Sequence, residues 1–235
     1  MSERLKALRL TITISIFAVM KMEMKRIYIL GDSYSTFEGF IPEGNAAWYH
    51  ENYENPDQVT DVFSAKDTWW QLLAKETGAE IVLNDSWSGS TVSYYAYDGR
   101  DCSGDSSFIC RFEKTLKENF FAKEEIDTAI IFGGTNDSWT GGPIGEVQYS
   151  DYKKEDLFSF LPALCYLFER LNETGVKNKL FVLNTELKPT LNEGVIIACE
   201  HYGITLVRPQ YIDKLSGHPS KAGMINIKEE IEKIV

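Results

Sequence analysis

Five short apolar runs, separated by segments with helical periodicity, constrain the fold of this chain more than any other feature. The apolar runs cover residues 25–30, 79–83, 128–132, 180–183 and 204–207. Apolar spacing with start and stop signals predicts helices over residues 67–78, 106–121, 157–171, 193–202 and 220–235. Strands that alternate with helices pair in parallel and are covered on both faces. The sequence therefore predicts an α/β fold built on a parallel sheet.

Length and composition fit one domain with one sizeable core. The chain has 235 residues, of which 43% are hydrophobic and 13% aromatic, and we expect a single domain over residues 25–235. The net charge is −11, and the lysines and arginines form no basic cluster. Phosphate binding needs such a cluster, so this balance argues against a nucleic-acid partner and against an anionic membrane surface.

The cysteines and the N-terminus bear on metal binding and localisation. Four cysteines (Cys102, Cys110, Cys165 and Cys199) lack CxxC spacing and neighbouring histidines, so no metal site is expected. Cys165 and Cys199 are predicted to be buried, whereas Cys102 and Cys110 would bridge only in an oxidising compartment.

Residues 1–24 combine basic residues with an apolar run but lack a clear cleavage site. We interpret them as an over-extended start, with initiation at Met22 or Met24 and a cytoplasmic protein. The alternative is a signal peptide and export.

Polar loops follow the first three apolar runs directly. Gly31-Asp32-Ser33 follows the first, a loop containing Gly89 follows the second, and Gly134-Thr135-Asn136 follows the third. Ligands of open parallel sheets bind beyond the carboxyl ends of the strands, so the three loops are expected to meet at one edge. Taken alone, each of these loops has a composition that is also common in ordinary turns. Together they predict a site with Ser33 as nucleophile.

Together with His218-Pro219 before the last helix, these loops resemble the SGNH (GDSL-type) hydrolases, a family of esterases and lipases. The resemblance runs in order from residue 25 to residue 235 and implies a three-layer αβα, flavodoxin-like fold with a five-stranded parallel sheet. It also implies that Ser33 is the nucleophile and that His218 is the general base. Ser33 N–H, Gly89 N–H and the Asn136 side chain would form the oxyanion hole. A neutral imidazole activates a serine, and each oxyanion donor lowers the barrier by roughly 3 kcal/mol.

The chain departs from the family pattern at the acid that orients the histidine. The family places this acid three residues before the histidine, where this chain has Leu215. Asp213, five residues before His218, would complete a triad if Ser216 and Gly217 loop out. Otherwise a backbone carbonyl orients His218 and the site is a Ser-His dyad. His50 is predicted to be a surface or substrate-lining residue, and His201 a structural one at a helix end.

The resulting hypothesis is a serine esterase that needs no cofactor and removes a short acyl group from a carbohydrate or another small polar molecule. One alternative is a non-catalytic domain of the same fold that binds glycans through Trp48, Tyr49, Trp87 and Trp139. The other is a Rossmann-like cofactor binder, although neither GxGxxG nor a P-loop follows the first strand.

Overall fold

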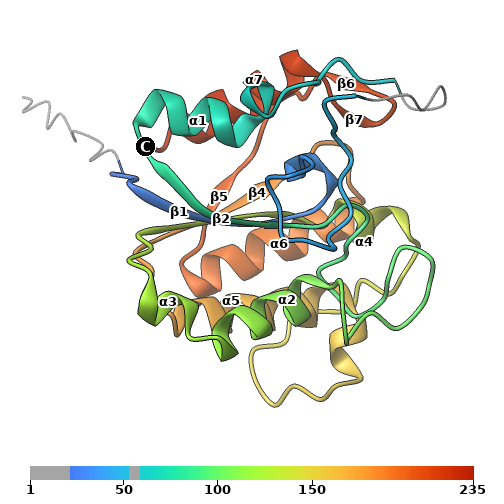
Figure 1. Cartoon of the computed structure of the whole chain (residues 1–235). Coiled ribbons are helices and arrows are strands. Elements are labelled where there is room, and N and C mark those ends of the chain that lie inside the picture. Colours follow the sequence, from blue (N-terminus) through green and yellow to red (C-terminus); the bar gives the residue numbers. More distant parts are fainter. Residues whose placement is uncertain (1–21, 53–58) are drawn as a thin grey trace, which may run out of the picture.

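A parallel five-stranded sheet forms the centre of the molecule (Figure 1). The computed structural model describes residues 22–52 and 59–235. All neighbouring strands of this sheet are parallel, in the order β2-β1-β3-β4-β5. The strands are β1 (Arg26–Gly31), β2 (Glu80–Ser86), β3 (Thr128–Gly133), β4 (Asn178–Leu183) and β5 (Thr205–Val207). The predicted α/β class and the five-stranded parallel sheet are confirmed.

Helices cover both faces of the sheet, which gives the three layers visible in Figure 1. On one face lie α1 (Trp69–Thr77) and α7 (Lys221–Glu232). The other face carries α2 (Phe108–Lys117), α3 (Phe120–Lys123), α5 (Phe160–Asn172) and α6 (Pro189–Tyr202). Capping follows the sequence signals, since the Thr68 side chain caps α1 and Gly78 ends it with φ of 72°. Among the described residues, no helix is long and apolar enough to cross a bilayer.

The central strands are buried on both faces, and their alternation separates two cores. Tyr28 and Leu30 of β1 pack with the helices of the α2/α5 side. Ile27 and Ile29, one residue out of step, pack with α1 and α7. This is the pattern of a parallel strand covered on both faces. With both cores filled by apolar side chains, the chemistry of the fold is confined to the loops at the strand ends.

Several element boundaries differ from those predicted. The second strand continues to Ser86, because Asn84, Asp85 and Ser86 keep their register with β1. The predicted helix over residues 106–121 divides into α2 and α3 at Asn119, whose φ is 56°. Helix α6 begins at Pro189, four residues before the predicted start, where proline fits the first turn.

Three short elements near the sheet edge were not predicted. They are the 3-10 turn η3 (Ser33–Ser35), the helix α4 (Thr135–Trp139) and a hairpin of β6 (Lys214–Leu215) with β7 (His218–Pro219). Two further 3-10 turns, η4 (Ala65–Asp67) and η5 (Asp156–Phe158), precede α1 and α5. Residues 1–21 of the predicted N-terminal extension lie outside the described residues, as do residues 53–58.

Candidate active site

Ser33 lies directly beyond the end of β1, in the turn η3. The Asp32 carboxylate caps this turn by accepting a hydrogen bond from Tyr34 N at 3.1 Å, as expected of a turn-organising residue. Only glycine fits at position 31, since a Cβ there would lie 2.5 Å from Ser86 Oγ. The close approach of β1 and β2 at this point therefore fixes where the turn carrying Ser33 begins.

His218 reaches Ser33 from the opposite end of the sequence. Its Nε2 lies 2.9 Å from Ser33 Oγ, and its Nδ1 lies 3.2 Å from the Ser216 carbonyl oxygen. An Nδ1–H tautomer would donate to that carbonyl and leave Nε2 free to accept the serine proton. The structure thus brings together the predicted nucleophile and the predicted base in the orientation that proton transfer requires.

The structure does not place Asp213 against this histidine. Ser216 and Gly217, with φ of 47° and 76°, form a two-residue turn that pairs Leu215 with His218 instead of looping out. The pairing continues to Ser220 N, which donates to Asp213 O at 3.0 Å.

The Asp213 carboxylate accepts hydrogen bonds from Tyr211 Oη at 2.9 Å and from Ser220 Oγ. These bonds lower its pKa, and among the described residues none joins it to His218. The observed geometry is therefore that of the Ser-His dyad, the alternative in which a backbone carbonyl faces His218 Nδ1.

The two loops predicted to complete the oxyanion hole meet Ser33 at one cleft. Asn136 is the second residue of α4, and its Nδ2 donates to the Ser90 carbonyl at 2.8 Å, which ties it to the Gly89 loop. The neighbouring Asp137 carboxylate accepts from Val92 N at 2.8 Å and from Ser93 N at 3.1 Å. Asp137 therefore fixes the loop behind Asn136.

The cleft has a volume of about 350 Å³ and opens at the carboxyl edge of the sheet. Its lining consists of Ser33, Trp48, Ser88, Gly89, Tyr97, Asn136, Trp139, Ser216 and His218. Two of the aromatic residues named for glycan binding, Trp48 and Trp139, belong to this lining. Tyr49 is fully buried in the core, and Trp87 lines a neighbouring hollow instead. Half of that aromatic set is therefore unavailable to a ligand in this cleft.

Arg111 is a residue of the site that the sequence reasoning missed. Its guanidinium donates to Gly31 O and to Ser90 Oγ, both at 3.1 Å, and forms an ion pair with Asp85 at 3.1 Å. It therefore joins the ends of β1 and β2 to the loop that follows Gly89. An arginine between Phe108 and Phe112 on the apolar face of a predicted helix was the available signal.

Burial sets the protonation of the two ionisable groups nearest Ser33. Desolvation lowers the pKa of His218 to about 4, so the imidazole is neutral at pH 7, and the Lys214 ammonium acts in the same direction. Desolvation also raises the pKa of Asp32 to about 7. A neutral imidazole facing a serine hydroxyl is the state from which a general base acts.

The other predicted polar residues lie away from this cleft. His50 pairs with Glu38 at 3.2 Å and lines a separate hollow, in agreement with a surface residue. His201, in the last turn of α6, stacks on Tyr149 at 3.8 Å, as expected of a structural residue. All four cysteines are free, and Cys165 and Cys199 are buried as predicted.

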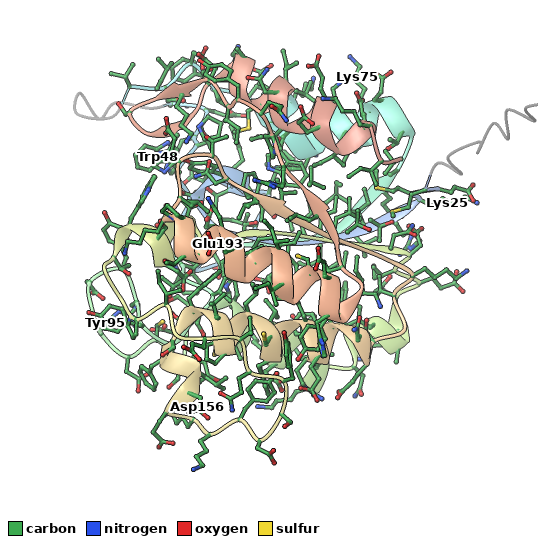
Figure 2. All side chains as sticks on the ribbon, turned by 180° about the vertical axis from the view of Figure 1, so that it is seen from behind. Lys25, Trp48, Lys75, Tyr95, Asp156 and Glu193 are labelled. Atoms are coloured by element: carbon green, nitrogen blue, oxygen red, sulfur yellow. The ribbon has the colours of Figure 1, made fainter. Side chains whose placement is uncertain are left out.

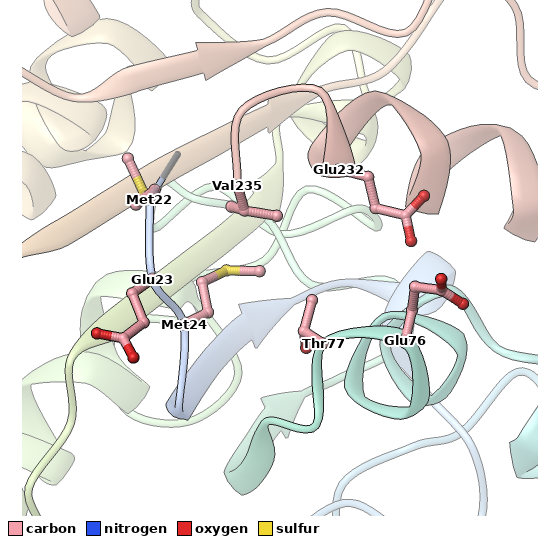
Figure 3. A pocket seen from close by; sticks show the side chains of 7 residues that line it. All are labelled: Met22, Glu23, Met24, Glu76, Thr77, Glu232 and Val235. Atoms are coloured by element: carbon pink, nitrogen blue, oxygen red, sulfur yellow. The ribbon is translucent and has the colours of Figure 1, made fainter. Parts of the chain in front are cut away.

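Figure 3 shows a further hollow, of about 450 Å³, where the chain enters β1. Its lining comprises Met22, Glu23, Met24, Glu76, Thr77, Glu232 and Val235. This lining contains neither histidine nor serine, and residues 22–24 of it precede the start of β1, whereas Ser33 follows the end of that strand. The cleft at Ser33 is therefore the candidate active site.

Comparison with known proteins places the chain in a family. Residues 25–235 match the family model described as GDSL-like Lipase/Acylhydrolase. A Bacteroides ovatus protein assigned by name to the GDSL-like lipases is 41% identical, with a TM-score of 0.81 over 90% of this chain and 98% of its own. Its counterpart from Bacteroides uniformis is 39% identical, with a TM-score of 0.82 over 90% and 95% of the two chains.

A family two carbohydrate esterase from Clostridium thermocellum, solved with cellohexaose, is 18% identical. Its TM-score is 0.59 over 89% of this chain and 62% of its own, so the likeness is one of fold. No curated protein matches. The chain belongs to the GDSL-like lipase/acylhydrolase family.

Proposed function

We propose that this chain is a serine esterase that removes a short acyl group from a carbohydrate or another small polar alcohol. The observation that carries the proposal is the 2.9 Å contact between His218 Nε2 and Ser33 Oγ. It joins a hydroxyl to a neutral imidazole at the floor of a cleft that also contains Gly89 and Asn136.

The reaction follows from these positions. Ser33 Oγ attacks the acyl carbonyl while His218 Nε2 takes its proton, and the carbonyl oxygen becomes an oxyanion. Ser33 N–H, Gly89 N–H and Asn136 Nδ2 are the donors for that oxyanion. His218 then returns the proton to the leaving alcohol, and an acyl-enzyme ester remains on Ser33. Water, deprotonated by the same imidazole, cleaves this ester and restores the serine.

Cleft size and lining support the substrate class. A volume of about 350 Å³ favours a short acyl chain. At its rim Trp139 and Tyr97 remain 42% and 55% exposed, and flat exposed rings of this kind suit the face of a sugar. Because the Clostridium thermocellum esterase shares only the fold, the carbohydrate part of the proposal rests on these two rings.

The test is a panel of aryl acetate, butyrate and octanoate esters together with acetylated oligosaccharides. Wild type is expected to prefer the shortest acyl group, and Ser33→Ala to lose at least about 10³-fold in kcat while keeping its fold. A fluorophosphonate probe should label wild type at Ser33. Ser103→Ala, a serine in a surface loop outside the cleft, is the matched control and should retain both activity and labelling.

Two results would contradict the proposal. Turnover that survives in Ser33→Ala would remove the assigned nucleophile. Binding of an oligosaccharide by a wild type that hydrolyses none of the esters would favour the glycan-binding alternative.

A further inference from the structure

The imidazole of His218 lacks the partner that usually fixes its plane. In the part of the chain that the structure describes, its polar partners are Ser33 Oγ and the Ser216 carbonyl. A carbonyl at 3.2 Å selects the Nδ1–H tautomer but carries no full charge and is a single contact. Rotation of the ring out of line with Ser33 must therefore be opposed by packing.

Among the aromatic rings of the described residues, Trp48 lies closest to this imidazole. The indole and the imidazole are stacked, with ring centroids 3.4 Å apart and planes inclined by 11°. Tyr34 meets the same imidazole at 5.4 Å and 61°, and its hydroxyl donates to Gly217 O at 2.6 Å within the hairpin turn. Figure 2 places Trp48 far from Lys25, which precedes β1, at the side of the molecule where the strands end.

The position of Trp48 is tied to both catalytic segments. Trp48 N–H donates to Thr36 Oγ1 at 2.8 Å, and Thr36 Oγ1 donates to the Ser33 carbonyl at 3.0 Å. The next residue, Tyr49, is fully buried, and its hydroxyl donates to the Pro219 carbonyl at 2.8 Å, directly after His218. The pair Trp48-Tyr49 therefore links the turn of the nucleophile to the hairpin of the base.

We propose that Trp48 is a positioning residue for the reaction, whose indole holds the His218 imidazole in the plane that contains Ser33 Oγ and Ser216 O. This inference rests on the proposed esterase function. The stacked face has a second effect, because an aromatic π-system attracts the imidazolium that forms when Ser33 transfers its proton. Trp48 thus carries out part of the work that a carboxylate performs in a triad.

Kinetics distinguish a positioning residue from one that only binds substrate. A positioning residue acts on kcat, because the misaligned base matters only once the substrate is bound. Trp48→Leu should therefore lower kcat about tenfold or more, with KM changed by less than about threefold. Trp48→Phe, which keeps a flat ring, should recover most of the lost kcat. Phe40→Leu, which removes an exposed aromatic residue of the same loop outside the cleft, is the matched control and should behave as wild type.

A measurement that needs no turnover keeps this inference distinguishable from the proposed function. Nitrogen-15 chemical shifts of the His218 ring report its tautomer. Wild type should show one Nδ1–H tautomer, and Trp48→Leu an average of the two. Thr36→Val, which releases both the Trp48 backbone and the Ser33 carbonyl but keeps the indole, should change the ring signals in the same direction by a smaller amount. This variant carries the test if Trp48→Leu does not fold.

Two kinetic results would overturn the role of Trp48. If the wild type is active and Trp48→Leu keeps both the wild-type kcat and the single tautomer, Trp48 has no positioning role. The proposed esterase function is not affected by that result. A raised KM at unchanged kcat overturns it equally, since Trp48 would then only line the substrate site. A wild type inactive on every ester overturns the proposed function, while the tautomer measurement still reports whether Trp48 fixes the ring.

Discussion

At the scale of single residues, the site depends on which group faces His218 Nδ1. That group is the Ser216 carbonyl, because Ser216 and Gly217 adopt the left-handed backbone that a two-residue hairpin turn needs. Gly223 is a second reason for the position of Asp213. A Cβ added at residue 223 would lie 2.0 Å from Asp213 O, so only glycine allows this close approach. Helix α7 therefore packs directly on the backbone of Asp213, two ladder positions from His218.

This geometry predicts unequal effects of two substitutions. Asp213→Asn should lower kcat by less than about tenfold, because the carboxylate holds Tyr211 and Ser220 and makes no contact with the imidazole. His218→Ala should lower kcat by about 10³-fold or more, since Ser33 then has no base. Steady-state kinetics on one aryl acetate, with unfolding curves to check the fold, would measure both. A loss of orders of magnitude in Asp213→Asn would instead indicate a triad.

At the scale of elements, the loops after β1, β2 and β3 are held together by buried polar contacts. Arg111 of α2 and Asp85 of β2 form an ion pair whose side chains are only 5% and 8% exposed. Arg111 also binds Gly31 O, Ser90 Oγ and Ser106 O, and Asn136 Nδ2 binds Ser90 O. The spacing between Ser33 and the predicted oxyanion donors is therefore set by one guanidinium as well as by the sheet.

Breaking this pair should be costly for stability. Arg111→Met should lower the free energy of unfolding by about 3–5 kcal/mol, because it leaves the Asp85 carboxylate buried without its cation. Asp85→Asn in the Arg111→Met background should recover part of that loss, since no uncompensated charge then remains buried. Urea unfolding of the wild type, both single variants and the double variant gives the coupling energy. Additive effects in this cycle would show that the pair does not act as a unit.

The elements also show how far the sequence could predict the site. Ser33 and Gly89 lie in turns that follow β1 and β2, Asn136 lies in the first turn of α4 after β3, and His218 lies in the hairpin before α7. The sequence placed each of them at a strand or helix end, and the structure brings all four to one cleft. Ser216 and Gly217 are residues that favour tight turns, but the hairpin they form was not predicted, and the position of Asp213 depends on the register of that hairpin.

Arg111 is an example of a site residue that the sequence could not predict. Its partners come from separate loops, and no one-dimensional pattern indicates which carbonyls a buried guanidinium will meet. Trp48 is a similar case, because the sequence around it has no helical or strand period that would place its aromatic ring on His218. Both positions are consequences of tertiary packing.

At the scale of the whole molecule, burial shifts the pKa values of two ionisable groups near Ser33 toward their neutral forms, and the two shifts affect stability in opposite directions. The pKa of His218 falls to about 4 from 6.5, so the unfolded chain binds more protons between these values and stability falls as the pH is lowered. The pKa of Asp32 rises to about 7 from 3.8, so the folded protein binds more protons in that window. The contribution of Asp32 to the free energy of unfolding therefore falls as the pH is raised.

The variant Asp32→Asn isolates the second effect, because His218 is present in both proteins and its contribution cancels in the difference. The Asn side chain does not titrate, and its oxygen can still accept from Tyr34 N. The free energy of unfolding of Asp32→Asn, minus that of wild type, should therefore increase as the pH rises from about 4 to about 7 and then level off. The increase should approach about 4 kcal/mol, because a pKa that differs by one between the folded and unfolded states corresponds to about 1.36 kcal/mol.

Urea unfolding at a series of pH values measures this difference. Asp213→Asn is the control of opposite sign, since the pKa of that carboxyl is lowered in the fold and its ionisation favours the folded state as the pH rises. A difference for Asp32→Asn that stays flat across the window would mean that Asp32 ionises in the folded protein at its ordinary pKa. The complete burial of Asp32, whose charged form loses its hydration in the fold, is the physical reason to expect the slope.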